Sequence, residues 1–235
     1  MSDLEPVAYA HAGMDLTGWL AHPAGTARAA VVLYPTIANV NAPMERRALM
    51  LSALGYLVLI ADFYGKPVPD FAAAGPLANE LRSDTDHYRG RIAAAIAALR
   101  VLAPDLPMLA IGYCMGGQAA LEAARDGQDL LAAVSFHGIL STGRNADPGT
   151  IKARLLVCHG DADPLVPRSQ VSAFWEEMDH AAANWHFHSY SGVKHGFTDP
   201  GSDARGLDAI AYNASADRQS WTAMLALFDE LLGQA

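Results

Sequence analysis

A cysteine flanked by glycines is the side chain of this sequence best suited to nucleophilic chemistry. Cys114 lies in the stretch GYCMGG at residues 112–117. This Gly-x-Cys-x-Gly spacing is typical of a nucleophile on a sharp strand-to-helix turn, where a Cβ on either flanking residue would clash. The N–H groups that open the next helix, that of Met115 first, would stabilise an oxyanion and lower the pKa of the thiol. A glycine-rich turn around an inert cysteine is the alternative.

A cysteine nucleophile requires a base and a third group that orients the base. In α/β-hydrolases the nucleophile, the acid and the histidine follow in this order along the chain. Of nine histidines, His195 alone lies in a glycine-bracketed loop before the last predicted helix, so it is the predicted base. Asp163 is the predicted acid because the pattern Gly-x-x-Asp-x-x-Val-Pro falls on residues 160–167. Asp161 is interpreted as a turn residue.

The remaining histidines and the second cysteine have structural interpretations. His186 and His188 alternate on a predicted strand and could form a metal pair, but no third ligand is evident, and we expect a solvated strand face. Cys158 falls in an apolar run and is expected to be a small core residue. Six other histidines are expected to be surface or structural residues: His11, His22, His87, His137, His159 and His180.

A second oxyanion donor is expected from the loop after an early buried strand. Thr36 and Ile37 occupy this loop, and the N–H of Ile37 is the predicted donor. Arg82 and Lys66 are candidate cations for an acidic group on a substrate. The chemistry requires no metal and no organic cofactor.

The elements that must position these residues alternate along the chain. A hairpin is predicted within residues 7–21, followed by buried strands at 29–34, 56–61, 107–111, 130–136 and 153–158 and a last strand at 185–190. Helices are predicted at 44–54, 88–102, 118–125, 171–178 and 221–232, a loop at 62–76, and no helix between 137 and 152. The alternation predicts an α/β-hydrolase fold in one domain over residues 1–235. Its mostly parallel sheet would have about seven or eight strands, with helices on both faces.

Charge and composition limit the partners. The formal net charge of -9 argues against nucleic acid and against anionic membranes. The acidic start of the sequence lacks the apolar region of a signal peptide, and no apolar run is long enough to span a bilayer. With only two cysteines and no secretion signal, we expect a cytoplasmic protein, monomeric or homodimeric, that acts on a small molecule.

Three motifs resemble the dienelactone hydrolase family: residues 112–117, residues 159–167, and Lys194 through Phe197. They occur in the family's order over nearly the full chain, and the cysteine in the turn is the most specific of them. The resemblance implies that Cys114, Asp163 and His195 form a catalytic triad.

The resemblance also identifies two positions at which this sequence differs from the founding enzyme of the family. There, a glutamate engages the resting thiol, and the matching residue is Thr36. An arginine four residues after the histidine binds the substrate carboxylate, and the matching residue is Asp199. Thr36, Arg82 and Asp199 are therefore the predicted substrate-binding residues, and Asp199 favours neutral over acidic substrates.

The predicted function is hydrolysis of a carboxylic ester or lactone through a thioester on Cys114. A thiol-based binding or redox-sensor protein on the same scaffold is one alternative. A cysteine peptidase is another, although no feature of the sequence marks an extended peptide cleft.

Overall fold

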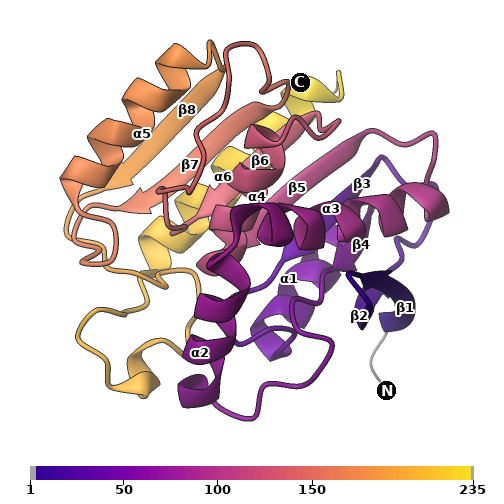
Figure 1. Cartoon of the computed structure of the whole chain (residues 1–235), viewed down its shortest axis with the longest axis horizontal. Coiled ribbons are helices and arrows are strands. Elements are labelled where there is room, and N and C mark those ends of the chain that lie inside the picture. Colours follow the sequence, from indigo (N-terminus) through magenta and orange to yellow (C-terminus); the bar gives the residue numbers. More distant parts are fainter. Residues whose placement is uncertain (1–3, 234–235) are drawn as a thin grey trace.

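Short apolar segments form the central sheet of the computed structural model, which describes residues 4–233 (Figure 1). The order across the sheet is β1-β2-β4-β3-β5-β6-β7-β8, and β3 to β8 are parallel whereas β1 and β2 are antiparallel to their neighbours. The strands are β1 (Leu4–His11), β2 (Met14–Ala21), β3 (Ala29–Tyr34), β4 (Tyr56–Ile60), β5 (Met108–Tyr113), β6 (Ala132–Phe136), β7 (Arg154–Gly160) and β8 (Trp185–Tyr190).

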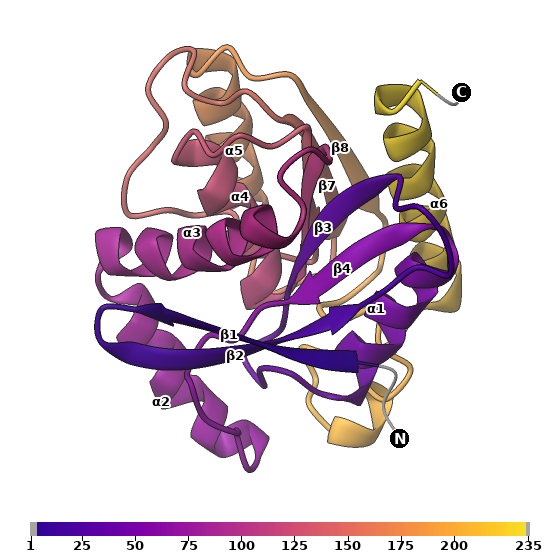
Figure 2. The ribbon, with the colours of Figure 1, turned by 90° about the vertical axis from the view of Figure 1, so that its right-hand side faces the viewer.

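Helices cover both faces of this sheet (Figure 2). α1 (Ala42–Ala53) and α6 (Ala214–Leu231) pack on one face, and α3 (Thr85–Leu102), α4 (Met115–Arg125) and α5 (Arg168–His180) pack on the other, with α2 (Phe71–Arg82) against α3. Neighbouring residues of a strand therefore enter different halves of the core, as Val31 and Val32 of β3 do. Burial on both sides explains why the central strands are continuous apolar runs. The predicted α/β-hydrolase fold is confirmed.

The strand β8 lies at the edge of the sheet and has a different pattern. His186 and His188 are both exposed, so the predicted solvated face is correct. Within residues 4–233, no group of three His, Cys, Asp or Glu side chains is placed to hold a metal ion.

The predicted loop at residues 62–76 is wrong in its second half, because α2 begins at Phe71. The Asp70 side chain caps the helix by accepting the N–H of Ala73 at 2.8 Å. Pro76 lies inside the helix, at the cost of one main-chain hydrogen bond. Buried contacts of Ala78 and Leu81 with the core offset this cost, which the local sequence could not indicate.

The connection between β6 and β7 contains no helix, as predicted. Buried charges hold it against the helices. Arg125 binds the carboxylate of Glu177 at 2.8 and 2.7 Å and donates to the Leu140 carbonyl at 2.7 Å. Arg89 donates to the Arg144 carbonyl at 2.7 Å and to Glu122 at 2.8 Å. Each charge of this cluster thus has a partner of opposite sign, without which its desolvation would be costly.

No helix in the described part of the chain combines the length and the hydropathy needed to cross a membrane.

Candidate active site

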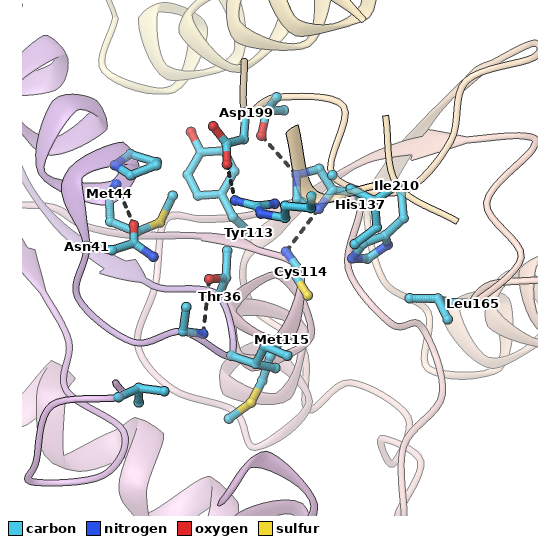
Figure 3. Close-up of a pocket in the computed structure, with 18 of the residues that line it drawn as sticks. Thr36, Asn41, Met44, Tyr113, Cys114, Met115, His137, Leu165, Asp199 and Ile210 are labelled. Carbon is cyan, nitrogen blue, oxygen red and sulfur yellow. Dashed lines mark hydrogen bonds and ion pairs between the residues drawn. The ribbon is translucent and has the colours of Figure 1, made fainter. Parts of the chain in front are cut away.

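Cys114 lies on the turn between β5 and α4, as the glycine spacing predicts. Its φ is +57° and its ψ is −118°, a strained conformation for a residue with a side chain. A Cβ at Gly112 would lie 1.8 Å from the Gly116 carbonyl oxygen, and one at Gly116 would lie 2.0 Å from that of Tyr34. Both glycines are therefore required by the close approach of backbone. Figure 3 shows Cys114 between Thr36 and Met115 on one side and His137 on the other.

His195 and Asp163 come together from the loops after β8 and β7. Nδ1 of His195 is 2.7 Å from Oδ2 of Asp163, and both side chains are buried. The second Asp163 oxygen accepts the N–H of Leu165 at 2.8 Å, which fixes the carboxylate. Asp161 points elsewhere and pairs with Arg168 at 2.7 Å. The structure thus brings Asp163 to the histidine and leaves Asp161 in a surface ion pair.

The Cys114 thiol and the His195 ring influence each other's charge. Removal from water would raise the pKa of Cys114, but the charge of His195 and the N–H groups of Met115 and Ile37 lower it below its ordinary value. Burial would lower the pKa of His195, but the charge of Cys114 and the hydrogen bond with Asp163 raise it to about 10. Nε2 of His195 makes no hydrogen bond of normal geometry with residues 4–233. Each of the two side chains therefore favours the charged form of the other.

The N–H groups of Met115 and Ile37 both lie at the sulfur, from the start of α4 and from the loop after β3. Two tyrosine hydroxyls bind the peptides that directly follow these N–H groups. Tyr64 donates to the Ile37 carbonyl at 3.2 Å, and Tyr88 donates to the Met115 carbonyl at 3.1 Å. Because a carbonyl and the N–H of its own residue lie on neighbouring peptides, these bonds restrain the direction of both donors.

A cavity of about 510 Å³ opens above the sulfur. Thr36, Arg82 and Asp199 all line it, whereas Lys66 is exposed and lies outside it. Most of the wall is apolar, with these side chains: Ile37, Val40, Pro43, Met44, Val68, Pro69, Tyr113, Met115, Ile139, Leu165 and Ile210.

The cavity wall contains equal numbers of carboxylate and guanidinium groups. Asp199 forms an ion pair with Arg205, which also lines the cavity. Arg205 therefore neutralises the Asp199 carboxylate. The sequence predicts that Asp199 repels acidic substrates, and this prediction is wrong in treating the carboxylate as unpaired. Arg82 donates to three neutral acceptors, the Ala78 carbonyl, Asn79 and Gln118. Asp70 is the second carboxylate of the wall, so two carboxylates face two guanidinium groups.

His137 was expected to be a surface or structural residue, but it is buried and lines the cavity. It directly follows β6, next to the strand that carries Cys114. The carboxyl ends of neighbouring parallel strands are where binding residues gather, and this position was the available signal. His159 is also buried, and within residues 4–233 its ring nitrogens have no hydrogen-bond partner.

Known proteins with similar sequences and structures share this arrangement of elements. A model of the dienelactone hydrolase family matches residues 16–232. The crystal structure of a dienelactone hydrolase-like promiscuous phosphotriesterase from metagenomic libraries has a TM-score of 0.91 and 35% identity, with coverage of 97% of this chain and 98% of that chain. A structure titled m3DLH has a TM-score of 0.88, 35% identity and the same coverage.

A curated Bradyrhizobium protein is also similar to this chain. Named "Probable 2-oxo-3-(5-oxofuran-2-ylidene)propanoate lactonase", it is 25% identical over 225 residues, which cover 89% of this chain and 87% of that protein.

Proposed function

The chain belongs to the dienelactone hydrolase family, and we propose that it hydrolyses neutral carboxylic esters or lactones through a thioester on Cys114. It is a hydrolase of the ester or lactone type. The observation that carries the proposed mechanism is the pairing of His195 with Asp163 beside a Cys114 thiol of lowered pKa, at the base of the cavity.

In the acylation half of the proposed reaction, the Cys114 sulfur bonds to the carbonyl carbon of the substrate. The electron pair of the C=O bond moves to oxygen, and the N–H groups of Met115 and Ile37 stabilise the resulting negative charge. The intermediate then collapses, the bond from carbon to the alcohol oxygen breaks, and His195 gives its proton to that oxygen. The alcohol leaves, or stays attached through its own chain in a lactone, and the acyl group remains on Cys114.

In the deacylation half, neutral His195 takes a proton from a water molecule, whose oxygen attacks the thioester carbon. The same two N–H groups hold the second oxyanion. The carbon–sulfur bond breaks, the carboxylic acid leaves, and Cys114 and His195 return to the thiolate and imidazolium forms. Asp163 keeps Nδ1 of His195 directed away from the substrate in every step.

The balance of charge in the cavity wall supports neutral substrates. Two carboxylates and two guanidinium groups leave no net positive charge there, and a Cys114 thiolate with a His195 imidazolium adds none. The side chain of Arg82, whose hydrogen-bond acceptors are neutral, is the group that would bind an acidic substrate if this proposal were wrong.

The mechanism is tested with a neutral aryl ester and the variant Cys114→Ala. We expect hydrolysis by the wild type and a loss of activity by several orders of magnitude in the variant. Cys158→Ser is the matched control and should retain activity, because Cys158 is a core residue away from the cavity. Mass spectrometry of acid-quenched enzyme should find the acyl group on the peptide that contains Cys114. Retained turnover in Cys114→Ala would refute the thioester mechanism.

A second candidate activity is hydrolysis of phosphotriesters, because the relative with a TM-score of 0.91 is titled a promiscuous phosphotriesterase. Such substrates are also neutral and place a developing negative charge on an oxygen. The test is turnover of an aryl dialkyl phosphate, with the search for a phosphorylated Cys114 in the quenched enzyme.

The same assays distinguish the proposed hydrolase from the non-hydrolytic alternative. A redox-sensor protein would turn over no ester of any acid size, while Cys114 would still be oxidised and reduced reversibly.

A further inference from the structure

We propose that His137 is a positioning residue for the hydrolytic site. Its neutral imidazole, protonated on Nε2, holds the backbone of Cys114 and the ring of His195 in place relative to each other. This inference rests on the proposed function and adds a residue that neither the sequence motifs nor the triad includes.

The hydrogen bonds of His137 determine its tautomer. The backbone N–H of Cys114 is shared between the Phe136 carbonyl at 3.0 Å and Nδ1 of His137 at 3.2 Å, so Nδ1 accepts and carries no hydrogen. Nε2 therefore carries the hydrogen and donates it to the Thr198 hydroxyl at 2.9 Å. Burial lowers the pKa of His137 well below its ordinary value, and the charges of His195, Arg47 and Arg205 act in the same direction. The surroundings of the His137 ring, including the nearby His195, thus favour its neutral form.

The ring of His137 also restricts the movement of His195. Their centroids are 5.0 Å apart at an interplanar angle of 68°. Phe197 contacts the same ring at 5.2 Å and 77°, so His137 has little freedom to turn. A fixed neighbour limits rotation of the His195 imidazole away from Asp163. One side chain therefore contacts both the nucleophile's backbone and the base.

The backbone of His137 is strained, which indicates that its position is imposed by its surroundings. Its φ is +40°, a region that side-chain-bearing residues rarely adopt. The N–H of His137 donates to the Cys158 carbonyl at 2.8 Å. Such strain persists where tertiary contacts over-determine it and is common at functional sites.

A chain of contacts connects His137 to the far helices. The Thr198 carbonyl accepts a hydrogen bond from Arg47 of α1 at 2.9 Å, and Arg47 pairs with Asp217 of α6. Thr198, and through it the ring of His137, is therefore anchored to two helices on one face of the sheet.

Two amide variants distinguish the roles of the two ring nitrogens of His137. His137→Asn places an acceptor near the position of Nδ1 and tolerates a positive φ. His137→Gln reaches toward Thr198 but has no acceptor at the Nδ1 position. With a neutral aryl ester, we expect the Asn variant to keep most of kcat. We expect the Gln variant to lose roughly tenfold or more in kcat with little change in KM, as a displaced nucleophile would.

A second measurement requires no turnover. The rate of Cys114 alkylation by iodoacetamide, followed against pH, reports how well His195 stabilises the thiolate. The midpoint should move to higher pH in His137→Gln and stay at the wild-type value in His137→Asn. His186→Asn, on the exposed edge strand, is the control and should behave as the wild type in both assays.

Circular dichroism and thermal melting verify that each variant is folded. If His137→Gln does not fold, Thr198→Val replaces it, since it removes the acceptor of the Nε2 hydrogen and should give the same upward shift. The proposal is overturned if both amide variants match the wild type. It is equally overturned if both are impaired alike, or if activity falls with no change in the alkylation midpoint. A wild type without esterase activity would refute the proposed function, while the alkylation profiles would still test His137.

Discussion

At the scale of single residues, the two cysteines are the same group in opposite surroundings. Cys114 is partly exposed beside His195 and two N–H groups, whereas Cys158 is fully buried in β7, where burial raises its thiol pKa to about 12. A hydrogen bond with Tyr190 acts to lower the pKa of Cys158, but its effect is too small to reverse that of burial. Reactivity therefore depends on the neighbours that stabilise the thiolate.

We expect iodoacetamide to modify Cys114 much faster than Cys158 at pH 7. Because the pKa of Cys114 is lowered, its thiolate persists below the pH at which an ordinary thiol is protonated, and alkylation should decline only as the pH falls through this lowered value. Peptide mass spectrometry after timed labelling measures both rates. Equal labelling of the two cysteines in folded protein would contradict the proposed thiolate.

Asp163 and Asp161 lie two residues apart and provide a matched comparison. Asp163→Asn removes the charge that orients and stabilises protonated His195, and we expect a loss in kcat of roughly 10³- to 10⁴-fold. Asp161→Asn breaks only an exposed surface pair with Arg168, which contributes little to stability, and should leave kcat unchanged. Steady-state kinetics of the two variants decide between the carboxylates. A large loss of kcat in Asp161→Asn would instead assign the orientation of His195 to Asp161.

At the scale of elements, α4 and α5 are joined through charges inside the core. Arg125 is fully buried, and its guanidinium lies between the carboxylates of Glu122 and Glu177. This cluster also holds the segment between β6 and β7 through the carbonyl of Leu140, next to the cavity residue Ile139. The loop without a helix is thus ordered by side chains of distant helices.

Removing Glu177 should be strongly destabilising, because it leaves the Arg125 charge with one carboxylate where it now has two. We expect Glu177→Ala to lower the free energy of unfolding by about 3–5 kcal/mol, as for other broken buried pairs. Glu176→Ala, at an exposed position of the same helix, should change it by no more than about 0.5 kcal/mol. Urea unfolding curves measure both values. Similar midpoints for the two variants would show that the cluster contributes little.

At the scale of the whole molecule, the cavity is assembled from segments that are far apart in the chain. Asp70 and Arg82 belong to the start and end of α2, whereas Asp199 and Arg205 belong to the connection between β8 and α6. The neutrality of the wall is a property of this assembly. Each pair of charges can therefore be altered without touching Cys114.

Asp199→Asn should make the cavity more favourable for acidic substrates, because it leaves the Arg205 guanidinium without its carboxylate partner. A hydrogen bond to a charged group contributes about 1.5–3 kcal/mol, so we expect kcat/KM for a carboxylated aryl ester to rise roughly tenfold relative to its neutral analogue. The double variant Asp199→Asn with Arg205→Gln should reverse the gain. A wild type that already prefers the acidic ester would point to Arg82 and refute the neutral-substrate proposal.

The sequence alone determined the order along the chain of the strands and of every α-helix except α2, and the turn that carries Cys114, since these depend on neighbouring residues. Apolar runs predict buried strands, and Gly112 is required by a contact within a few residues, with Gly116, whereas Gly116 and Gly117 are required by the close approach of Tyr34 and of Gly138. The candidates Asp163 and His195 could be found because such residues follow strands in a known order.

Only the tertiary structure decided features that depend on contacts between distant residues. The helix α2 contains Gly75 and Pro76, which locally oppose a helix, and it exists because its other side chains enter the core. Asp199 is neutralised by Arg205, and His137 lies between Cys114 and Thr198, 23 and 61 residues away in sequence. These contacts form when the carboxyl ends of β5, β6, β7 and β8 meet at one edge of the sheet, and no local pattern encodes which side chains then touch.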